Sequence, residues 1–119
     1  MYRKLGRDNK HRRSMLANLT KDLVMNEEIV TTETRAKEVR KFVDKMITYG
    51  KDQTLESRRR VAAFFHNDKK VTSKVCDDLA KRYQDRKGGY ARIVKIAERR
   101  GDNSLMVVIK LVQEKEQQN

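Results

Sequence analysis

Two short segments of the chain hold nearly all of its excess positive charge. Residues 1–13 carry six basic side chains and one acidic side chain, and residues 81–100 carry eight basic and two acidic ones. The remaining residues hold fifteen basic and fourteen acidic side chains, so they supply only +1 of the formal net charge of +12. A surface that merely keeps a protein soluble intersperses both signs, whereas concentrated positive charge suits a polyanion that releases counterions on binding. The pattern indicates contact with the phosphates of a nucleic acid.

The first basic segment combines an arm with the start of a helix. Residues 1–8 show no apolar periodicity, so we expect an extended basic arm there, and a helical pattern begins at Asn9. Cations near a helix N-terminus oppose the helix dipole, and folding alone would favour acidic residues at these positions. We therefore expect phosphates to neutralise these groups, and a solvated basic tail is the alternative. The candidate RNA contacts in this segment are Arg3, Lys4, Arg7, Lys10, His11, Arg12 and Arg13.

The second basic segment is predicted to be a loop that leads into a β-hairpin. Residues 84–89 are polar and end in two glycines, while residues 90–97 and 105–112 are rich in β-branched side chains and enclose a run of turn formers. Glycine lets a backbone approach nucleic acid closely, and arginine suits bidentate phosphate contact. Tyr90 could stack on an unpaired base, but we favour a place for it in the protein core. The candidate RNA contacts in this segment are Arg86, Lys87, Gly88, Gly89, Arg92, Lys95, Arg99 and Arg100.

Apolar residues at spacings of three and four predict four helices that must position these segments. The first helix begins at Asn9, and the second follows a short strand at Glu27–Thr32 and is capped by Gly50. Thr54 caps the third helix, and a break at residues 67–68 precedes the fourth. The stripe of the second helix that we expect to be buried consists of Ala36, Val39, Val43, Met46 and Ile47.

These elements predict an α+β fold. We expect four helices packed against a small mixed sheet, which consists of one short early strand plus a C-terminal β-hairpin. The extended basic arm would precede them. The predicted organisation is an arm over residues 1–8, a single α+β RNA-binding domain over residues 9–112 and a polar tail over residues 113–119.

Residues that could carry catalysis or hold a metal are few and scattered. Cys76 lies on an apolar helical stripe, His11 lies inside the basic segment, and His66 is far from both. No spacing of a zinc site and no phosphate-cradling glycine motif occurs. We therefore expect no enzyme, no cofactor, no metal and no small-molecule substrate. A single cysteine agrees with a reducing cytoplasm, and no apolar run approaches the roughly 20 residues of a membrane span.

Charge alone does not separate RNA from DNA, because both present phosphates. No helix-turn-helix pattern has a recognition helix rich in base-reading side chains. The basic residues instead fall in an arm, a loop and a turn, which suit irregular folded RNA better than a regular groove. A small DNA-architectural protein stays as the second hypothesis. The run Arg58-Arg59-Arg60 spans about 200° of a helix, so for it a solvated surface is as plausible as a binding site.

Three stretches of the sequence follow a known pattern in order and with matching spacing. They are RKLGR at 3–7 with HR at 11–12, IVTT at 29–32 with AKEVR at 36–40, and YQDRKGGYARI at 83–93 with RRGD at 99–102. Together they resemble the bacterial family of large-subunit ribosomal protein seventeen over nearly the whole chain. The resemblance implies a structural constituent of the cytoplasmic ribosome that contacts large-subunit ribosomal RNA and neighbouring ribosomal proteins. It also implies a position near the polypeptide exit tunnel and no catalytic residues.

Overall fold

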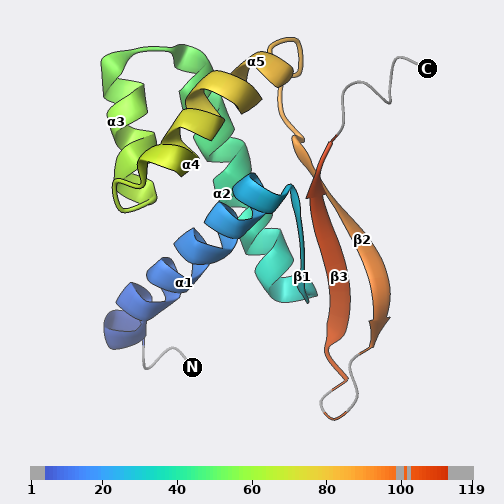
Figure 1. The fold of residues 1–119 in the computed structure, drawn as a ribbon. Helices are drawn as coiled ribbons and strands as arrows, with labels where there is room; N and C mark the ends of the chain where they lie inside the picture. Colours follow the sequence, from blue (N-terminus) through green and yellow to red (C-terminus); the bar gives the residue numbers. More distant parts are fainter. Residues whose placement is uncertain (1–4, 99–100, 102, 113–119) are drawn as a thin grey trace, which may run out of the picture.

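The computed structural model describes residues 5–98, 101 and 103–112, and for residues 5–9 the backbone alone. Within these residues the chain forms four helices and three strands (Figure 1). Their order is α1 (Leu5–Asn26), β1 (Glu28–Thr32), α2 (Glu33–Asp52), α3 (Leu55–Phe64), α4 (Lys69–Ser73), η1 (Lys74–Leu79), α5 (Ala80–Arg82), β2 (Ala91–Glu98) and β3 (Leu105–Leu111). The fourth helix consists of α4, the π-helical η1 and α5, which follow one another without a break. The predicted α+β fold is confirmed.

The three strands form one sheet in the order β1-β3-β2. Ile29, Ile109 and Ile93 lie in one row across it, and both strand pairs are antiparallel. The prediction of a mixed sheet is therefore wrong in strand direction. A hairpin makes β2 and β3 antiparallel, and the long helical segment between β1 and the hairpin lets β1 pair in either direction. The helices lie on one side of the sheet in Figure 1.

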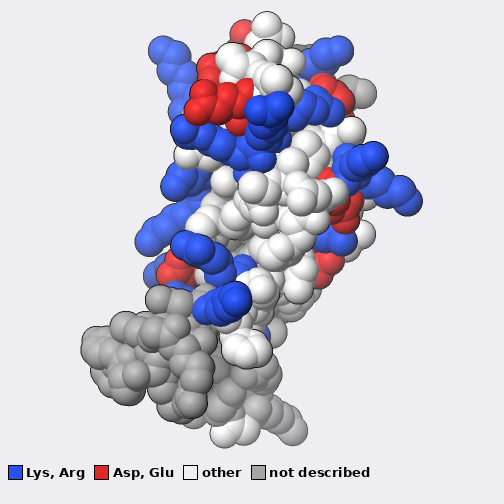
Figure 2. Space-filling model, turned by 90° about the vertical axis from the view of Figure 1, so that its left-hand side faces the viewer, with Lys and Arg blue, Asp and Glu red and all other residues white. Residues whose placement is uncertain are grey.

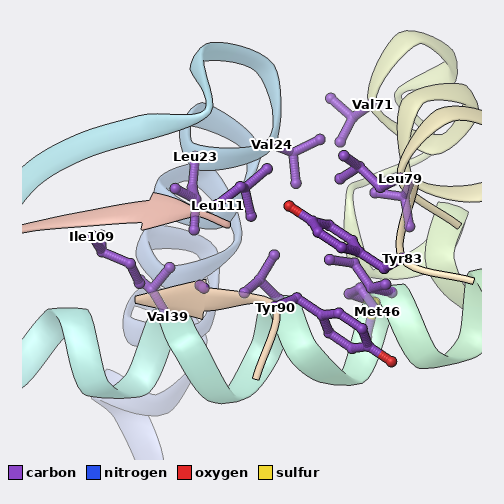
Figure 3. Close-up of a cluster of buried hydrophobic side chains, with 14 of the residues drawn as sticks. Leu23, Val24, Val39, Met46, Val71, Leu79, Tyr83, Tyr90, Ile109 and Leu111 are labelled. Carbon is purple, nitrogen blue, oxygen red and sulfur yellow. The ribbon is translucent and has the colours of Figure 1, made fainter. Parts of the chain in front are cut away.

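The core lies between α2 and the sheet face that the helices cover. α2 buries the predicted stripe in full, with Ala36, Val39, Val43, Met46 and Ile47 almost inaccessible to solvent. Opposite it, β3 contributes Val107, Ile109 and Leu111. Tyr83 and Tyr90, whose ring centroids lie 5.2 Å apart, pack among these aliphatic side chains (Figure 3). Burial of this apolar surface is the main favourable term in folding, so α2 is the frame that positions the other elements.

The first helix begins earlier than predicted. Its backbone is helical from Leu5, so residues 5–8 are helical rather than extended. Once a helix is nucleated, each further residue adds a hydrogen bond at low entropic cost, and leucine and arginine are good helix formers. Leu16, Leu23 and Val24 of this helix are buried. Residues 1–4 of the predicted arm and the whole predicted tail lie outside the described residues.

Gly50 has a different role from the predicted helix cap. α2 continues through it to Asp52 and ends with Gln53 in the left-handed region at φ 57°. A Cβ on Gly50 would lie 3.1 Å from the carbonyl oxygen of Val75 in η1. The glycine therefore lets the fourth helix pack closely against α2, which is a requirement of packing rather than of helix termination.

Candidate nucleic-acid interface

The loop between the fourth helix and β2 is fastened to α2 by side chains far away in the sequence. We call residues Arg86–Tyr90 the pinned loop. The backbone N–H of Tyr90 donates to Oδ1 of Asp44 at 3.1 Å, and Nζ of Lys51 donates to the Tyr90 hydroxyl at 3.0 Å. Lys51 also donates to the carbonyl oxygen of Arg86, as does the Tyr90 hydroxyl. Both ends of the loop are therefore tied to one face of α2.

Tyr90 is part of the core and is not available for stacking on a base. It is 1% exposed, so the preference for a buried Tyr90 is confirmed. Its ring also lies under the Lys51 ammonium, which is 5.2 Å from the ring centroid. Burial raises the pKa of the Asp44 carboxyl, while the hydrogen bond from Tyr90 and the charge of Arg40 act in the opposite direction.

The residues of the pinned loop differ in how far they are exposed to solvent. The Nε–H of Arg86 donates to the carbonyl oxygen of Gly89 at 3.1 Å, so this half-buried side chain helps to close the loop. Lys87 and Gly89 are exposed, and Gly88 is half-buried. Gly88 and Gly89 have φ angles of 140° and 62°, which explains why glycine is favoured at both positions. Of the predicted loop contacts, Lys87 is the cation most open to a ligand.

The two predicted contacts on β2 lie on opposite faces of the sheet. Arg92 is in register with Lys110 of β3, and both are exposed on the face away from the helices. Lys95 is in register with the buried Val107 and so shares the other face, although it is itself exposed. Sequence reasoning missed Lys110. The alternation of side chains along the predicted hairpin could have found it once the strand register was known.

The basic turn of α1, residues Lys10–Arg13, stands open to solvent. All four of its side chains are exposed. Nη2 of Arg12 forms an ion pair with Oε1 of Glu38 in α2 at 2.8 Å, so the protein itself already uses this cation. Lys10, His11 and Arg13 form no ion pair or hydrogen bond with the described part of the chain. These three are therefore the most available groups of the turn.

Arg82, at the start of the second basic segment, serves the fold instead. Arg82 donates two hydrogen bonds, at 2.7 and 2.8 Å, to the two carboxylate oxygens of Glu27. Lys74 lies 3.0 Å from the same carboxylate. This half-buried cluster ties the fourth helix to the turn between α1 and β1, and it raises the pKa of Arg82. Arg82 therefore belongs to the internal structure.

The structure keeps the two basic segments apart. In Figure 1 the first turns of α1 lie at the lower left and the pinned loop at the upper right of a molecule that extends 43 × 40 × 21 Å. Arg92 and Lys110 lie on the sheet, on the side away from α1. Among the predicted contacts, Arg3, Lys4, Arg99 and Arg100 lie outside the described residues, and for Arg7 the backbone alone is described.

The described residues offer little to catalysis. They contain no group of three or more His, Cys, Asp or Glu side chains that could hold a metal ion. Cys76 is buried, and burial raises the pKa of its thiol, which disfavours the reactive thiolate. Among the helices in the described ranges, each is too short or too polar to cross a membrane.

Known proteins resemble this chain over almost its whole length. A family model described as ribosomal protein L17 matches residues 15–112. A protein of Ligilactobacillus salivarius called large ribosomal subunit protein bL17 is 59% identical, over 93% of this chain and 98% of its own length. Proteins of the same name from Lactobacillus helveticus and Fusobacterium nucleatum are 52% and 50% identical, over 93% of this chain and 98% and 95% of their own lengths.

These similarities define a structural constituent of the large ribosomal subunit, not an enzyme. The chain belongs to the ribosomal protein L17 family, as the resemblance of its sequence motifs implied. As a bacterial ribosomal protein, it has its place in the ribosome of the cytoplasm.

Proposed function

We propose that the chain binds large-subunit ribosomal RNA through two separate basic surfaces and stabilises the folded RNA near the polypeptide exit tunnel. One surface is the basic turn of α1. The other consists of Arg92 and Lys110 on the outer sheet face, together with Lys87 of the pinned loop. Neighbouring large-subunit proteins would flank these contacts.

The observation that carries the proposal is the exposed row Glu28, Lys110 and Arg92 across the sheet. Like charges directly opposite each other on neighbouring strands destabilise a sheet, and one acid does not balance two bases here. A bound phosphate would remove that repulsion. Arginine and lysine are the usual groups for phosphate contact in RNA complexes, where they contribute affinity and register rather than base specificity.

The mechanism is neutralisation at a fixed spacing. Each basic surface lets a phosphate-rich RNA segment approach closely, because cations replace counterions that the RNA had condensed. The buried core around α2 sets the distance between the surfaces. A rigid protein with separate cationic ends can therefore hold two RNA segments that would otherwise repel each other.

Binding of transcribed large-subunit ribosomal RNA at several salt concentrations tests this proposal. We expect Arg92→Ala and Arg12→Ala each to weaken binding and to lower the slope of log affinity against log salt by about one unit. Lys41→Ala, at an exposed position on α2, is the matched control. Unchanged slopes in both variants would contradict phosphate contact. Equal competition by duplex DNA would favour the DNA-architectural hypothesis.

The position near the exit tunnel rests on the family resemblance and needs its own test. An iron chelate tethered to a cysteine in place of the exposed Lys45 would cleave nearby RNA in reconstituted large subunits. We expect cleavage to concentrate in RNA segments at the tunnel outlet. Cleavage confined to segments far from the outlet would contradict the position near the exit tunnel but not the proposed RNA binding.

A further inference from the structure

A groove between α3 and the fourth helix is separate from both proposed RNA surfaces. It has a volume of about 560 Å³, within the size range of ligand-binding clefts. Its floor includes Leu55 and Ala62 of α3, and Leu55 is 65% exposed. A smaller recess of about 120 Å³ shares Leu55 and Arg58 with it, so the hollow continues toward Gln53 at the end of α2. Exposed leucine in a hollow is apolar surface that a partner could cover.

Basic side chains border this apolar floor. Arg58 and Arg59 line it from α3, and Lys69 lines it from α4. Arg58 is held in place by Asp77, with its two terminal nitrogens 3.2 and 3.5 Å from the carboxylate oxygens. Arg59 and Lys69 form no hydrogen bond or ion pair with the described residues. Figure 2, which views the molecule from the side of α3, shows many basic side chains around uncharged surface.

The acidic side chains Glu56, Asp68 and Asp77, on or beside the helices that form the groove, are each paired with a basic side chain of this protein. Glu56 accepts from Arg60 at 3.1 Å, and Asp77 holds Arg58. Asp68 accepts from Lys21 at 2.7 Å and also caps α4 through the backbone N–H groups of Lys70 and Val71. The border of the groove therefore keeps an excess of positive charge, and an acidic ligand would complement it.

The lining favours a protein ligand over RNA. The residues that line the groove within the described chain are aliphatic, hydroxylic or basic, apart from the amide Asn67, and none of them has an aromatic ring. An unpaired base stacks best on an aromatic ring or on a guanidinium plane, and of the two guanidinium groups in the lining that of Arg58 is committed to Asp77, which leaves only that of Arg59. Aliphatic side chains, in contrast, gain directly from covering Leu55 and Ala62.

We propose that this groove docks a segment of a neighbouring large-subunit protein that presents an aliphatic side chain flanked by acidic residues. The aliphatic side chain covers Leu55 and Ala62, and the flanking carboxylates meet Arg59 and Lys69. This contact is independent of the RNA surfaces, since it uses none of their residues. The three arginines at 58–60 then have different roles. Arg58 and Arg59 line the groove, whereas Arg60 lies over the ring of Tyr49 on α2, 5.5 Å from its centroid.

Photocrosslinking in assembled large subunits tests the proposal with a matched pair of neighbouring alanines. A benzophenone side chain at position 62 would lie at the groove, whereas one at the exposed position 63 would not. We expect position 62 to crosslink to a protein at least tenfold more strongly than position 63. Mass spectrometry should map the crosslink to a segment with an aliphatic residue next to acidic residues. A crosslink to RNA, a mapped segment without acidic residues, or equal yields at both positions would overturn the proposal.

Charge reversal at the border provides a second test, and its proteolysis readout does not depend on the benzophenone being tolerated. Lys69→Glu should lower the crosslink yield from position 62 severalfold, and should expose the same partner segment to proteolysis in the unmodified groove. Lys70→Glu, one residue further on and outside the groove, is the control and should change neither readout. Both variants should enter the subunit at wild-type levels. Equal effects of the two substitutions would show that the charge of Lys69 does not contribute to binding of the partner segment, and would contradict the proposal.

Discussion

The pinned loop and the basic turn of α1 present cations in two different ways. The loop has no regular secondary structure of its own, and Asp44 and Lys51 of α2 fix its two ends. The turn is held by the regular hydrogen bonds of a helix, and its side chains project freely except for Arg12, which pairs with Glu38. The loop is therefore ordered by tertiary contacts, and the turn by local ones.

This difference determines how each surface should respond to mutation. A helix keeps its shape when one exposed side chain is lost, so changes in the turn should alter binding without altering stability. A loop held by a few partly buried hydrogen bonds should lose both binding and stability when one of those bonds is lost. The predictions below test that distinction, beginning with the largest expected effect.

Lys51→Met should have the largest effect because it removes one hydrogen bond at each end of the pinned loop at once. It removes the donor to the Arg86 carbonyl and to the Tyr90 hydroxyl, leaving polar groups near the core without that partner. We expect a loss of about 1–3 kcal/mol in the free energy of unfolding. RNA affinity should fall as well, because the loop must then be ordered on binding. Urea unfolding and RNA binding measure the two effects.

Lys45→Met removes an exposed lysine from the same helix and serves as the control for this change. It should leave the free energy of unfolding within about 0.5 kcal/mol of the wild type. In the contrary outcome, Lys51→Met lowers stability and yet leaves RNA affinity equal to that of Lys45→Met. That result would show that the fixed shape of the pinned loop does not contribute to RNA binding, and it would contradict the distinction drawn between the loop and the turn.

Asp44→Asn should have a smaller effect, and its sign depends on pH. The folded protein raises the pKa of Asp44 above its unfolded value of 3.8, so the ionised carboxylate carries a folding cost above the folded pKa. This cost disappears as the pH falls below the unfolded value. An asparagine keeps an oxygen for the Tyr90 N–H but does not titrate. We therefore expect the stability of the variant relative to the wild type to be higher at pH 7 than at pH 3.

Urea unfolding of both proteins at several pH values between 3 and 7 would measure this difference. The change should be concentrated just above pH 3.8, where the unfolded chain has ionised and the folded chain has not. A relative stability that moved the other way would mean that the hydrogen bond from Tyr90 outweighs burial in setting the charge of Asp44.

Local patterns predicted the parts of the molecule that local interactions determine. All five residues that the apolar spacing predicted for the buried stripe of α2 are buried, and Thr54 accepts from the Ser57 N–H at 3.1 Å as an N-cap should. These features depend on residues within a few positions of one another.

The errors and omissions come from contacts between distant residues. Lys51 resembled an ordinary cation in the last turn of a helix, and nothing near it indicated a bond to residue 86. Gly50 looked like a helix cap because α2 does end two residues later, while its actual constraint is η1 across the interface. Lys110 became a candidate once the register placed it beside Arg92. Such facts require the tertiary structure.

Arg13→Ala tests the turn without the complication of an internal partner. Arg13 is exposed and pairs with no described residue, so its loss should leave the free energy of unfolding unchanged within about 0.5 kcal/mol. If it meets a phosphate, the salt slope of RNA binding should fall by about one unit. Thermal unfolding and binding over a range of salt measure both. A clear loss of stability would show that the turn, like the loop, depends on tertiary contacts.

Glu38→Gln should have the smallest effect and the opposite sign. The ion pair between Arg12 and Glu38 is half-exposed, and pairs of this kind contribute roughly 0.2–1 kcal/mol. Removing the carboxylate frees Arg12 for RNA and removes a negative charge near the turn, so RNA affinity should rise, by about fivefold at most. The gain should vanish in an Arg12→Ala background, which a double-mutant cycle would show. A gain that persisted there would mean that Glu38 repels RNA directly and that Arg12 is not the group it restrains.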